Sequence, residues 1–550
     1  MCRPAHASVR PLSTESIEGN STQLESSWTA TSILVRAFPF YCLALMLMYF
    51  GYFSEYNPGR FWLLGAGCLL GAVPYIVYYG LLAPPIVSIY TWWSFFLLFP
   101  KKGPPPEADS LFSIGFGIVP SAGSMYSLLE VVCLVTVAVA AARAQFSRLR
   151  LIRSRPEMRV VWAVLCAVCM LGIAHLMAEG FRAPDARSND HVSMMLALWP
   201  IAAAMLVVPA LKFVTDAKQV AILFRLVVVS GLFVVLEAAL ALIGWLPEPI
   251  VYYSLNYRGA FRSFLQSGDL FVGQLLILGV ASAAYFAITT HKAGYVLAVG
   301  LFVALVFATY DRACVAGVLV TTVVIAACAN RRTRAAVGVL TLFAALLLAV
   351  DRFALDGSLT GVLDDALNVP SMGKSSYFDA SSSIARIGTS ARGLDVFLSS
   401  PFMGAGPGNV SIAMGDPSLR GPLSETNLPE IARDVYWEIM TGVHQTDPHN
   451  LFVSMAAEYG FMGILLAVTI IAVVTRNTLR LMALGNAGNR PQIAGRIASL
   501  VAMAALGGYG TYFMFQAQPP IFAVCCVLLH IATGTAPTPQ AASGSAALRP

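Results

Sequence analysis

The chain contains a long series of apolar segments, each close to the length that crosses a bilayer. A spanning helix needs about 20 mostly apolar residues. Segments that meet or nearly meet this length lie at about 30–52, 61–80, 83–100, 124–142, 158–178, 192–212, 219–245, 270–288, 293–309, 313–329, 335–351, 449–474, 497–514 and 519–534. Because 57% of the 550 residues are hydrophobic and only 12% are charged, a soluble fold could not bury them. The sequence predicts an all-α polytopic membrane protein with about 14 transmembrane helices, or 12–14 if the weakest segments (83–100 and the last) do not span.

The basic residues fall unevenly on the two sides of this series. If the N-terminus is cytoplasmic, the internal loops carry sixteen Lys and Arg residues and the short external loops carry eight. Positive charge is enriched in cytoplasmic loops, so we predict that both termini are cytoplasmic. The net charge of +6 is explained by this bias, and no basic stripe with interleaved aromatic residues indicates a nucleic-acid partner.

One external connection, residues 352–448, is 97 residues long. A connection of this length is usually functional. It holds eleven acidic and six basic residues and no cysteine, so disulfides cannot hold it together. Two stretches, "SSIARIGTSARGLDVFLSS" and "LPEIARDVYWEIMT", have a helical pattern, and we expect them to cover the outer face of the spans.

Where this loop enters the next apolar segment, the sequence reads "HQTDPHNLFVSMAAEYGFMG". Asp447 is a good N-cap and Pro448 suits the first helical position, which would place His449 and Asn450 in the first turn. The helix dipole favours a neutral imidazole at that end, available as a base or hydrogen-bond partner. On spacing alone, a simple helix start with an interfacial histidine explains the pattern equally well.

Four segments together resemble the O-antigen ligase and O-antigen polymerase superfamily. "HNLFVSMAAEYGFMG" has the family's His-Asn, nine residues, Gly, two residues, Gly pattern, and it is the most specific of the four. "NYRGAFRSF", "ATYDRACVAGVLV" and "ARGLDVFLSSPFMGAGPGNV" resemble, in order, the family's Arg-Gly, Ser-Arg-Gly/Ala and Arg-…-Pro-…-Gly-x-Gly-x-Gly segments. The second of these departs from the pattern, since Tyr-Asp replaces the usual Thr-Ser. The resemblance covers about residues 219–475.

This resemblance implies a membrane glycosyltransferase that moves a glycan from undecaprenyl pyrophosphate to an acceptor sugar on the periplasmic face of the bacterial inner membrane. The acceptor is lipid A core for a ligase and another repeat unit for a polymerase of O-antigen or exopolysaccharide. The family is thought to act without a metal or other cofactor. Its partners are the lipid-linked glycan, the acceptor, the bilayer and other polysaccharide assembly proteins. Protein O-glycosylation is a third choice of acceptor within the same chemistry. Ligase and polymerase both stay open.

With the resemblance, the chain divides into five parts. Residues 1–29 and 535–550 are predicted to be disordered cytoplasmic tails. Residues 30–218 form N-terminal transmembrane helices, 219–475 the ligase/polymerase-like core with the periplasmic loop 352–448, and 476–534 the C-terminal transmembrane helices.

The leaving diphosphate needs cations, and arginine binds phosphate through a planar fork that never loses its charge. The predicted diphosphate or substrate contacts are Arg258, Arg262, Arg312 and Arg392. The alternatives are a snorkelling interfacial side chain for Arg262, an ion pair with Asp311 for Arg312, and a solvated helix face for Arg392. Arg386 is a weaker candidate.

His449 is the predicted catalytic base, and Asn450 is predicted to orient it or to contact a sugar. His444 has no counterpart in the family pattern and is expected to be a loop residue. Acidic residues in or near the spans, Glu130, Glu237, Asp269 and Glu458, are not assigned to catalysis. For Glu458 we expect a hydrogen bond to a neighbouring helix, because it lies on another face of the helix from His449.

Two other classes of function fit the sequence less well than an enzyme does. A transporter or flippase would show an inverted repeat and paired charges near the bilayer centre, whereas here no repeat is visible and the polar groups gather at outer helix ends. A non-catalytic scaffold would not need arginines at three external helix mouths.

Overall fold

The computed structural model describes residues 156–182, 217–246, 269–309, 382–419, 428–441, 448 and 450–483. It also describes short stretches or single residues between 77 and 143, at 201, 205 and 261, and between 314 and 322. All the elements assigned in this part are helices, in agreement with the predicted all-α class. They are α7 (Pro156–Arg182), α9 (Ala217–Leu242), α11 (Asp269–Thr290), α12 (Ala293–Ala308), α16 (Ser382–Ser399), α17 (Val410–Met414), α18 (Glu430–Met440) and α19 (Leu451–Ala483).

Three of these helices are long and apolar enough to cross a membrane, through Arg159–Ala178, Ala221–Leu242 and Phe452–Thr469. Helices α11 and α12 contain shorter apolar stretches, Leu275–Thr290 and Ala293–Ala308. These five stretches coincide with predicted spans. The other predicted spans lie wholly or largely outside the described residues, so the count of about fourteen stays a prediction.

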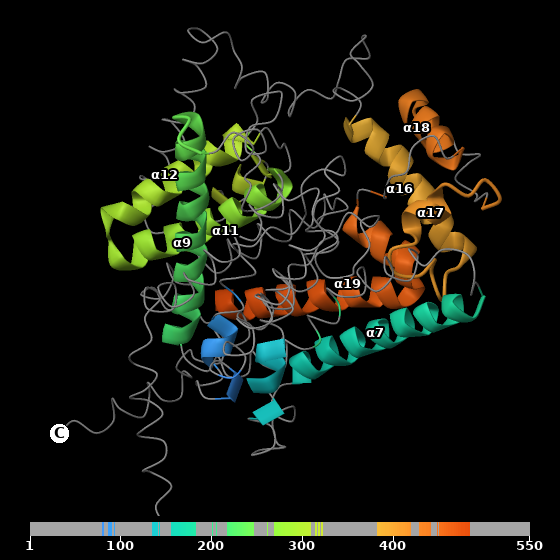
Figure 1. Ribbon diagram of the computed structural model, residues 1–550, viewed down its shortest axis with the longest axis horizontal. Coiled ribbons are helices and arrows are strands. Elements are labelled where there is room, and N and C mark those ends of the chain that lie inside the picture. The colour runs from blue at the N-terminus through green and yellow to red at the C-terminus, as the bar shows by residue number, and fades with distance from the viewer. Residues whose placement is uncertain are drawn as a thin grey trace, which may run out of the picture.

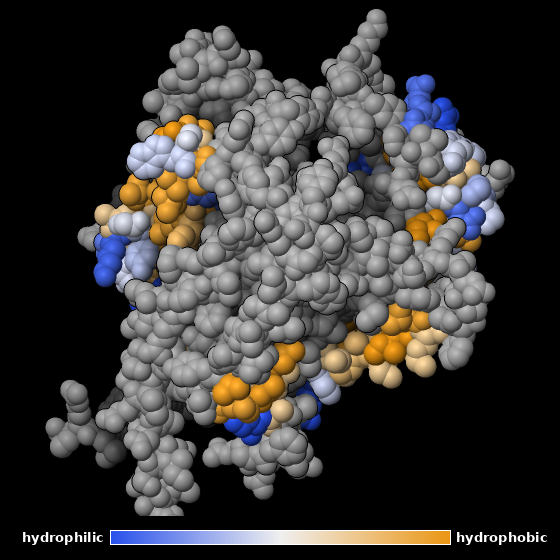
Figure 2. All heavy atoms as spheres, viewed as in Figure 1, coloured by the Kyte–Doolittle hydropathy of each residue, from blue (hydrophilic) through white to orange (hydrophobic). Residues whose placement is uncertain are grey.

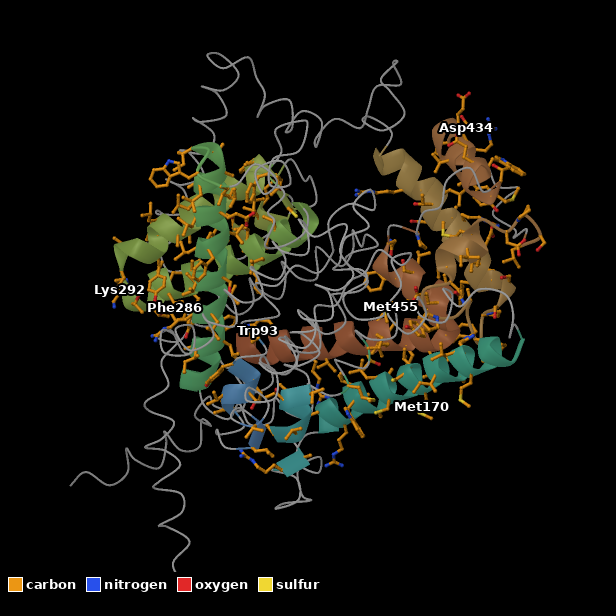
Figure 3. The ribbon with its side chains drawn as sticks, in the orientation of Figure 1. Trp93, Met170, Phe286, Lys292, Asp434 and Met455 are labelled. Atoms are coloured by element: carbon orange, nitrogen blue, oxygen red, sulfur yellow. The ribbon has the colours of Figure 1, made fainter. Side chains whose placement is uncertain are left out.

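Helices α9, α11 and α12 pack on one another on one side of the molecule (Figure 1). Helix α11 is apolar all round and is enclosed along most of its length, with Leu276, Ile277 and Ala281 fully buried. Only His291 and Lys292 separate α11 from α12, and His291 adopts a left-handed φ of 54° in this tight reversal. Lys292 is exposed at the reversal (Figure 3).

Helices α7, α16, α17, α18 and α19 form a second group. Figure 1 shows α7 running alongside α19, while α16, α17 and α18 lie together over one end of α19. The outward surface of α7 is apolar, with Met170 65% and Met177 57% exposed, and it appears as a hydrophobic stripe in Figure 2. An apolar stripe on a helix of spanning length is expected where lipid covers the protein.

Helices α16 and α18 are the two helices predicted within the long external connection. Buried side chains of α18 recur at helical spacing, namely Ala432, Val435, Tyr436, Ile439 and Met440. Asp434, on the opposite face, points away from α16 (Figure 3). Helix α18 is therefore amphipathic and packs its apolar face on α16.

Candidate functional site

The candidate site is the beginning of α19, where the long external connection meets the apolar helix. Of the predicted site residues, the structure describes Arg392 and Asn450. His449, Arg258, Arg262 and Arg312 lie outside the described residues, as does His444. Their predicted roles stay predictions, and the described residues show what flanks His449 in the chain.

Asn450 caps α19. Its side-chain oxygen Oδ1 accepts hydrogen bonds from the backbone N–H groups of Phe452 (3.0 Å) and Val453 (3.3 Å). An N-cap side chain makes these bonds because the first N–H groups of a helix lack partners within the helix. Helix α19 thus begins at Leu451, three residues after the predicted first position at Pro448. The expectation that Pro448 starts the helix is wrong, because Asn450 supplies the capping oxygen.

Pro448, one residue before His449, is held by α16. Its carbonyl oxygen accepts hydrogen bonds from the hydroxyls of Ser390 (3.0 Å) and Thr389 (3.3 Å). Pro448 also packs closely on Gly393, one turn further along α16. A Cβ atom added at Gly393 would lie 2.6 Å from Cγ of Pro448 and 2.8 Å from Cγ1 of Val453. Three neighbouring positions of α16 therefore fix the backbone just before His449.

Arg392 faces into the domain formed by α16, α17 and α18, which we name the external domain after its predicted side of the membrane, and its side chain is 0% exposed. Its Nε donates to the carbonyl of Met414 (2.7 Å), and its Nη2 donates to those of Asp416 (2.6 Å) and Ala413 (3.5 Å). Its Nη1 donates to the carbonyl of Leu419. The alternative of a solvated helix face is wrong, because carbonyls at the end of α17 and in the segment after it enclose the guanidinium. The predicted diphosphate contact stays a prediction, which this geometry does not favour.

A second buried polar contact joins α16 to α18. The Tyr436 hydroxyl donates to Oδ2 of Asp395 (2.5 Å), and the Arg392 guanidinium lies 5.7 Å from the centre of the Tyr436 ring. Asp395 is 0% and Tyr436 1% exposed. Burial, together with the bond to Asp395, raises the pKa of Tyr436 to about 12. Hydrogen bonds to buried charges thus join α16, α17 and α18, in a loop that contains no cysteine.

The glycine-rich turn at 404–408 docks against a break in α19. Gly404, Gly406 and Gly408 have φ values of 72°, 90° and 76°, which favour glycine. The backbone N–H groups of Ala405 and Gly406 donate to the carbonyls of Ala457 (2.7 Å) and Glu458 (3.0 Å). The turn returns the loop to the apolar helix.

Gly460 breaks α19, with φ 59° and ψ −143°. Beyond the break, the N–H of Phe461 donates to the carbonyl of Pro401 (2.8 Å) instead of continuing the helix. The loop therefore supplies backbone partners on both sides of the break. Irregular backbone within an apolar segment is tolerated where other protein groups satisfy it. The segment that approaches Gly460 closely is the loop, at Pro401 and Phe402.

Glu458 lies at the same break and is 6% exposed. Its Oε1 accepts a hydrogen bond from the N–H of Gly408 (3.1 Å), so this bond goes to the loop turn, whereas the sequence predicted a bond to a neighbouring helix. Helix α7 contacts the residue just before the turn, because Nε2 of His175 lies 2.8 Å from the carbonyl oxygen of Met403. Residues 403–408 thus contact both α7 and α19.

The comparison with protein families bears on this region. Residues 297–468 match the model of the O-antigen ligase family. The matched residues of this chain run from α12 through the external domain into α19. They include Arg312, Arg392, His449 and Asn450. Arg258 and Arg262 precede it. The match confirms the resemblance to the O-antigen ligase and polymerase superfamily and supports a function of that kind. No curated protein matches the chain significantly.

Sequence reasoning did not find Ser390, Thr389, Asp395 or Tyr436. The sequence contained one indication of Asp395, because Arg392 and Asp395 are three residues apart and share a helix face. Nothing in the sequence linked Ser390 to Pro448, 58 residues away. In the described part of the chain, no group of three or more His, Cys, Asp and Glu side chains could hold a metal, and metal-independent chemistry stays a prediction.

Proposed function

We propose that this protein is a membrane glycosyltransferase that moves a glycan from undecaprenyl pyrophosphate to an acceptor sugar on the periplasmic face. The O-antigen ligase match supports the class of reaction. The structural observation that supports His449 as the site is the pair of contacts made by the residues on either side of it. The preceding carbonyl is bonded to α16, and the following residue caps α19.

In the proposed reaction, an acceptor hydroxyl attacks the anomeric carbon of the lipid-linked sugar. A new glycosidic C–O bond forms, and the bond from the anomeric carbon to the pyrophosphate oxygen breaks. His449 accepts the hydroxyl proton, and undecaprenyl pyrophosphate leaves as the anion. A general base of this kind contributes about 10²- to 10⁴-fold to the rate.

The leaving pyrophosphate gains negative charge in the transition state, where fixed cations are most effective. We assign Arg258, Arg262 and Arg312 to this task. For Arg392 we propose a positioning role in place of the predicted diphosphate contact, because its donors are bonded to carbonyls of its own domain. Asn450 acts through the helix cap beside His449.

Deletion of the gene in its native host, followed by sizing of the undecaprenyl-linked and surface glycans, tests the proposal. Long chains that accumulate on the lipid carrier would assign a ligase of lipopolysaccharide. Single repeat units without long chains would assign a polymerase of O-antigen or exopolysaccharide. Unchanged glycans in the deletion strain would contradict both assignments.

Complementation then tests the site. A His449→Ala protein that inserts at normal abundance should not restore the glycan, while His444→Ala, five residues away in the same loop, should restore it. Full restoration by His449→Ala would refute the catalytic assignment. If neither variant restores the glycan although both insert at normal abundance, transfer depends on the loop as a whole. That result would contradict a specific role for the His449 imidazole.

A further inference from the structure

We infer that Ser390 and Thr389 of α16 are positioning residues for His449. This inference rests on the proposed function, in which His449 is the base. Neither hydroxyl is assigned by the family resemblance. Both reach the carbonyl of Pro448, and that carbonyl belongs to the peptide bond whose nitrogen is the backbone nitrogen of His449.

The two bonds are not equivalent. A hydroxyl has one proton to donate. Thr389 lies 3.1 Å from the carbonyl of Arg386 in its own helix and 3.3 Å from that of Pro448, so it divides its proton between them. Among the residues that the structure describes, Ser390 has one acceptor, the Pro448 carbonyl at 3.0 Å. Ser390 is therefore the principal contact and Thr389 the auxiliary one.

The apolar contact beside these bonds limits how far the peptide can move. Gly393 lets Pro448 approach α16 so closely that even one added carbon atom would overlap it. Pro448 itself is buried. The peptide plane before His449 is thus held by two hydroxyls and by a close packing contact, while Asn450 holds the chain after it.

A held backbone matters because a general base must reach its proton within hydrogen-bond distance. A displacement of about 1 Å at such a group can lower the rate about 10²-fold. Helix α16 belongs to the external domain and α19 to the apolar part of the chain, so the Ser390–Pro448 bond ties the residue before the proposed base to α16, close to where α19 begins.

The test compares Thr389→Val/Ser390→Ala with the parent in membranes of the deletion strain that contain the native donor and acceptor. We expect normal abundance and a glycan-transfer rate lowered about 10- to 100-fold. The acid limb of the pH profile should move, because the surroundings of the base change. Thr389→Ser and Ser390→Thr keep the hydroxyls and should retain most of the rate. Thr441→Val is the matched control, since Thr441 donates to the Trp437 carbonyl at the end of α18, away from Pro448.

A second readout does not depend on activity. In a His449→Cys background, a membrane-impermeant maleimide should label position 449 at a different rate once the two hydroxyls are removed. If the double variant does not accumulate, Ser390→Ala alone replaces it in both assays. An unchanged transfer rate and an unchanged labelling rate would each overturn the positioning role.

The inference and the proposed function can fail separately. If His449→Ala abolishes transfer but the hydroxyl variants do not lower it, only the positioning role is refuted. If His449→Ala restores full glycan, the catalytic role of His449 fails, and the labelling rate alone then decides whether Ser390 and Thr389 hold this segment. A rate loss in the hydroxyl variants that persists unchanged in a His449→Ala background would also refute the inference, because a positioning residue acts only through its partner.

Discussion

The Tyr436 hydroxyl donates a 2.5 Å hydrogen bond to Oδ2 of Asp395, and both side chains are closed off from solvent. This bond joins the two main helices of the external domain. Asp395 lies one turn after Arg392 on α16, so the domain has a cation, a carboxylate and a phenol in its interior. Burying such charges is costly unless each group is bonded, and leaving one without its partner is more costly still.

Tyr436→Phe should destabilise the external domain by about 2–4 kcal/mol, because the buried Asp395 carboxylate loses the phenol that donates to it. The measurement is thermal unfolding of the full chain in detergent. Trp437→Phe, at the neighbouring and partly exposed position, should shift the midpoint much less. Equal shifts in the two variants would argue against the buried bond.

Because the pKa of Tyr436 is raised, we expect the external domain to lose stability at alkaline pH. The folded protein raises the pKa of Tyr436 to about 12, above an unfolded value near 10, because it favours the neutral phenol. The stabilisation is therefore complete below about pH 10 and is lost as the pH rises toward 12. The difference in unfolding midpoint between the parent and Tyr436→Phe should be constant from pH 7 to 9 and should shrink between pH 10 and 12. A difference that disappears below pH 9 would contradict this assignment.

Gly404→Ala should destabilise the docking of the loop on α19. The new Cβ would lie 2.3 Å from the carbonyl oxygen of Glu458, and the φ of 72° disfavours side chains. We expect a loss of folded protein, with a free-energy cost of more than about 1 kcal/mol from backbone strain alone. Gly300→Ala in α12 is the control, since nothing lies within 4 Å of its added Cβ, and alanine should be neutral or slightly stabilising there. Similar yields of the two variants on size-exclusion chromatography would refute the predicted clash.

Arg392→Lys separates a structural role from a ligand role. Lysine keeps the charge but cannot reproduce the planar fork that bonds the carbonyls of Met414, Asp416 and Leu419. We expect the unfolding midpoint to fall, with a cost of about 2–5 kcal/mol, since hydrogen bonds to a buried charge are lost. The concentration of lipid-linked donor needed for half-maximal transfer should not change in the protein that remains folded. An unchanged midpoint with a raised donor requirement would restore the predicted diphosphate contact.

Several of the described helices followed from local patterns. Runs of apolar residues predicted the apolar helices, and helical periodicity predicted α16 and α18, because these properties depend on residues close together in the chain. The start of α19 was misplaced by three residues, since Asp447-Pro448 and Asn450 both resemble helix starts and only the observed cap distinguishes them. The burial of Arg392 was also missed, because the carbonyls that enclose it come from a segment more than twenty residues away.

The sequence by itself predicted a helical membrane protein and its resemblance to the O-antigen ligase and polymerase superfamily, because hydropathy and the His-Asn…Gly…Gly pattern are written in consecutive residues. Only the tertiary structure decided which groups hold that pattern in place. Ser390 meets Pro448 across 58 residues, and the turn at Ala405 meets the break in α19 near Gly460. Such pairings arise when the backbone and side-chain polar groups of one segment find partners in another, and no local property of either segment specifies which partner that is.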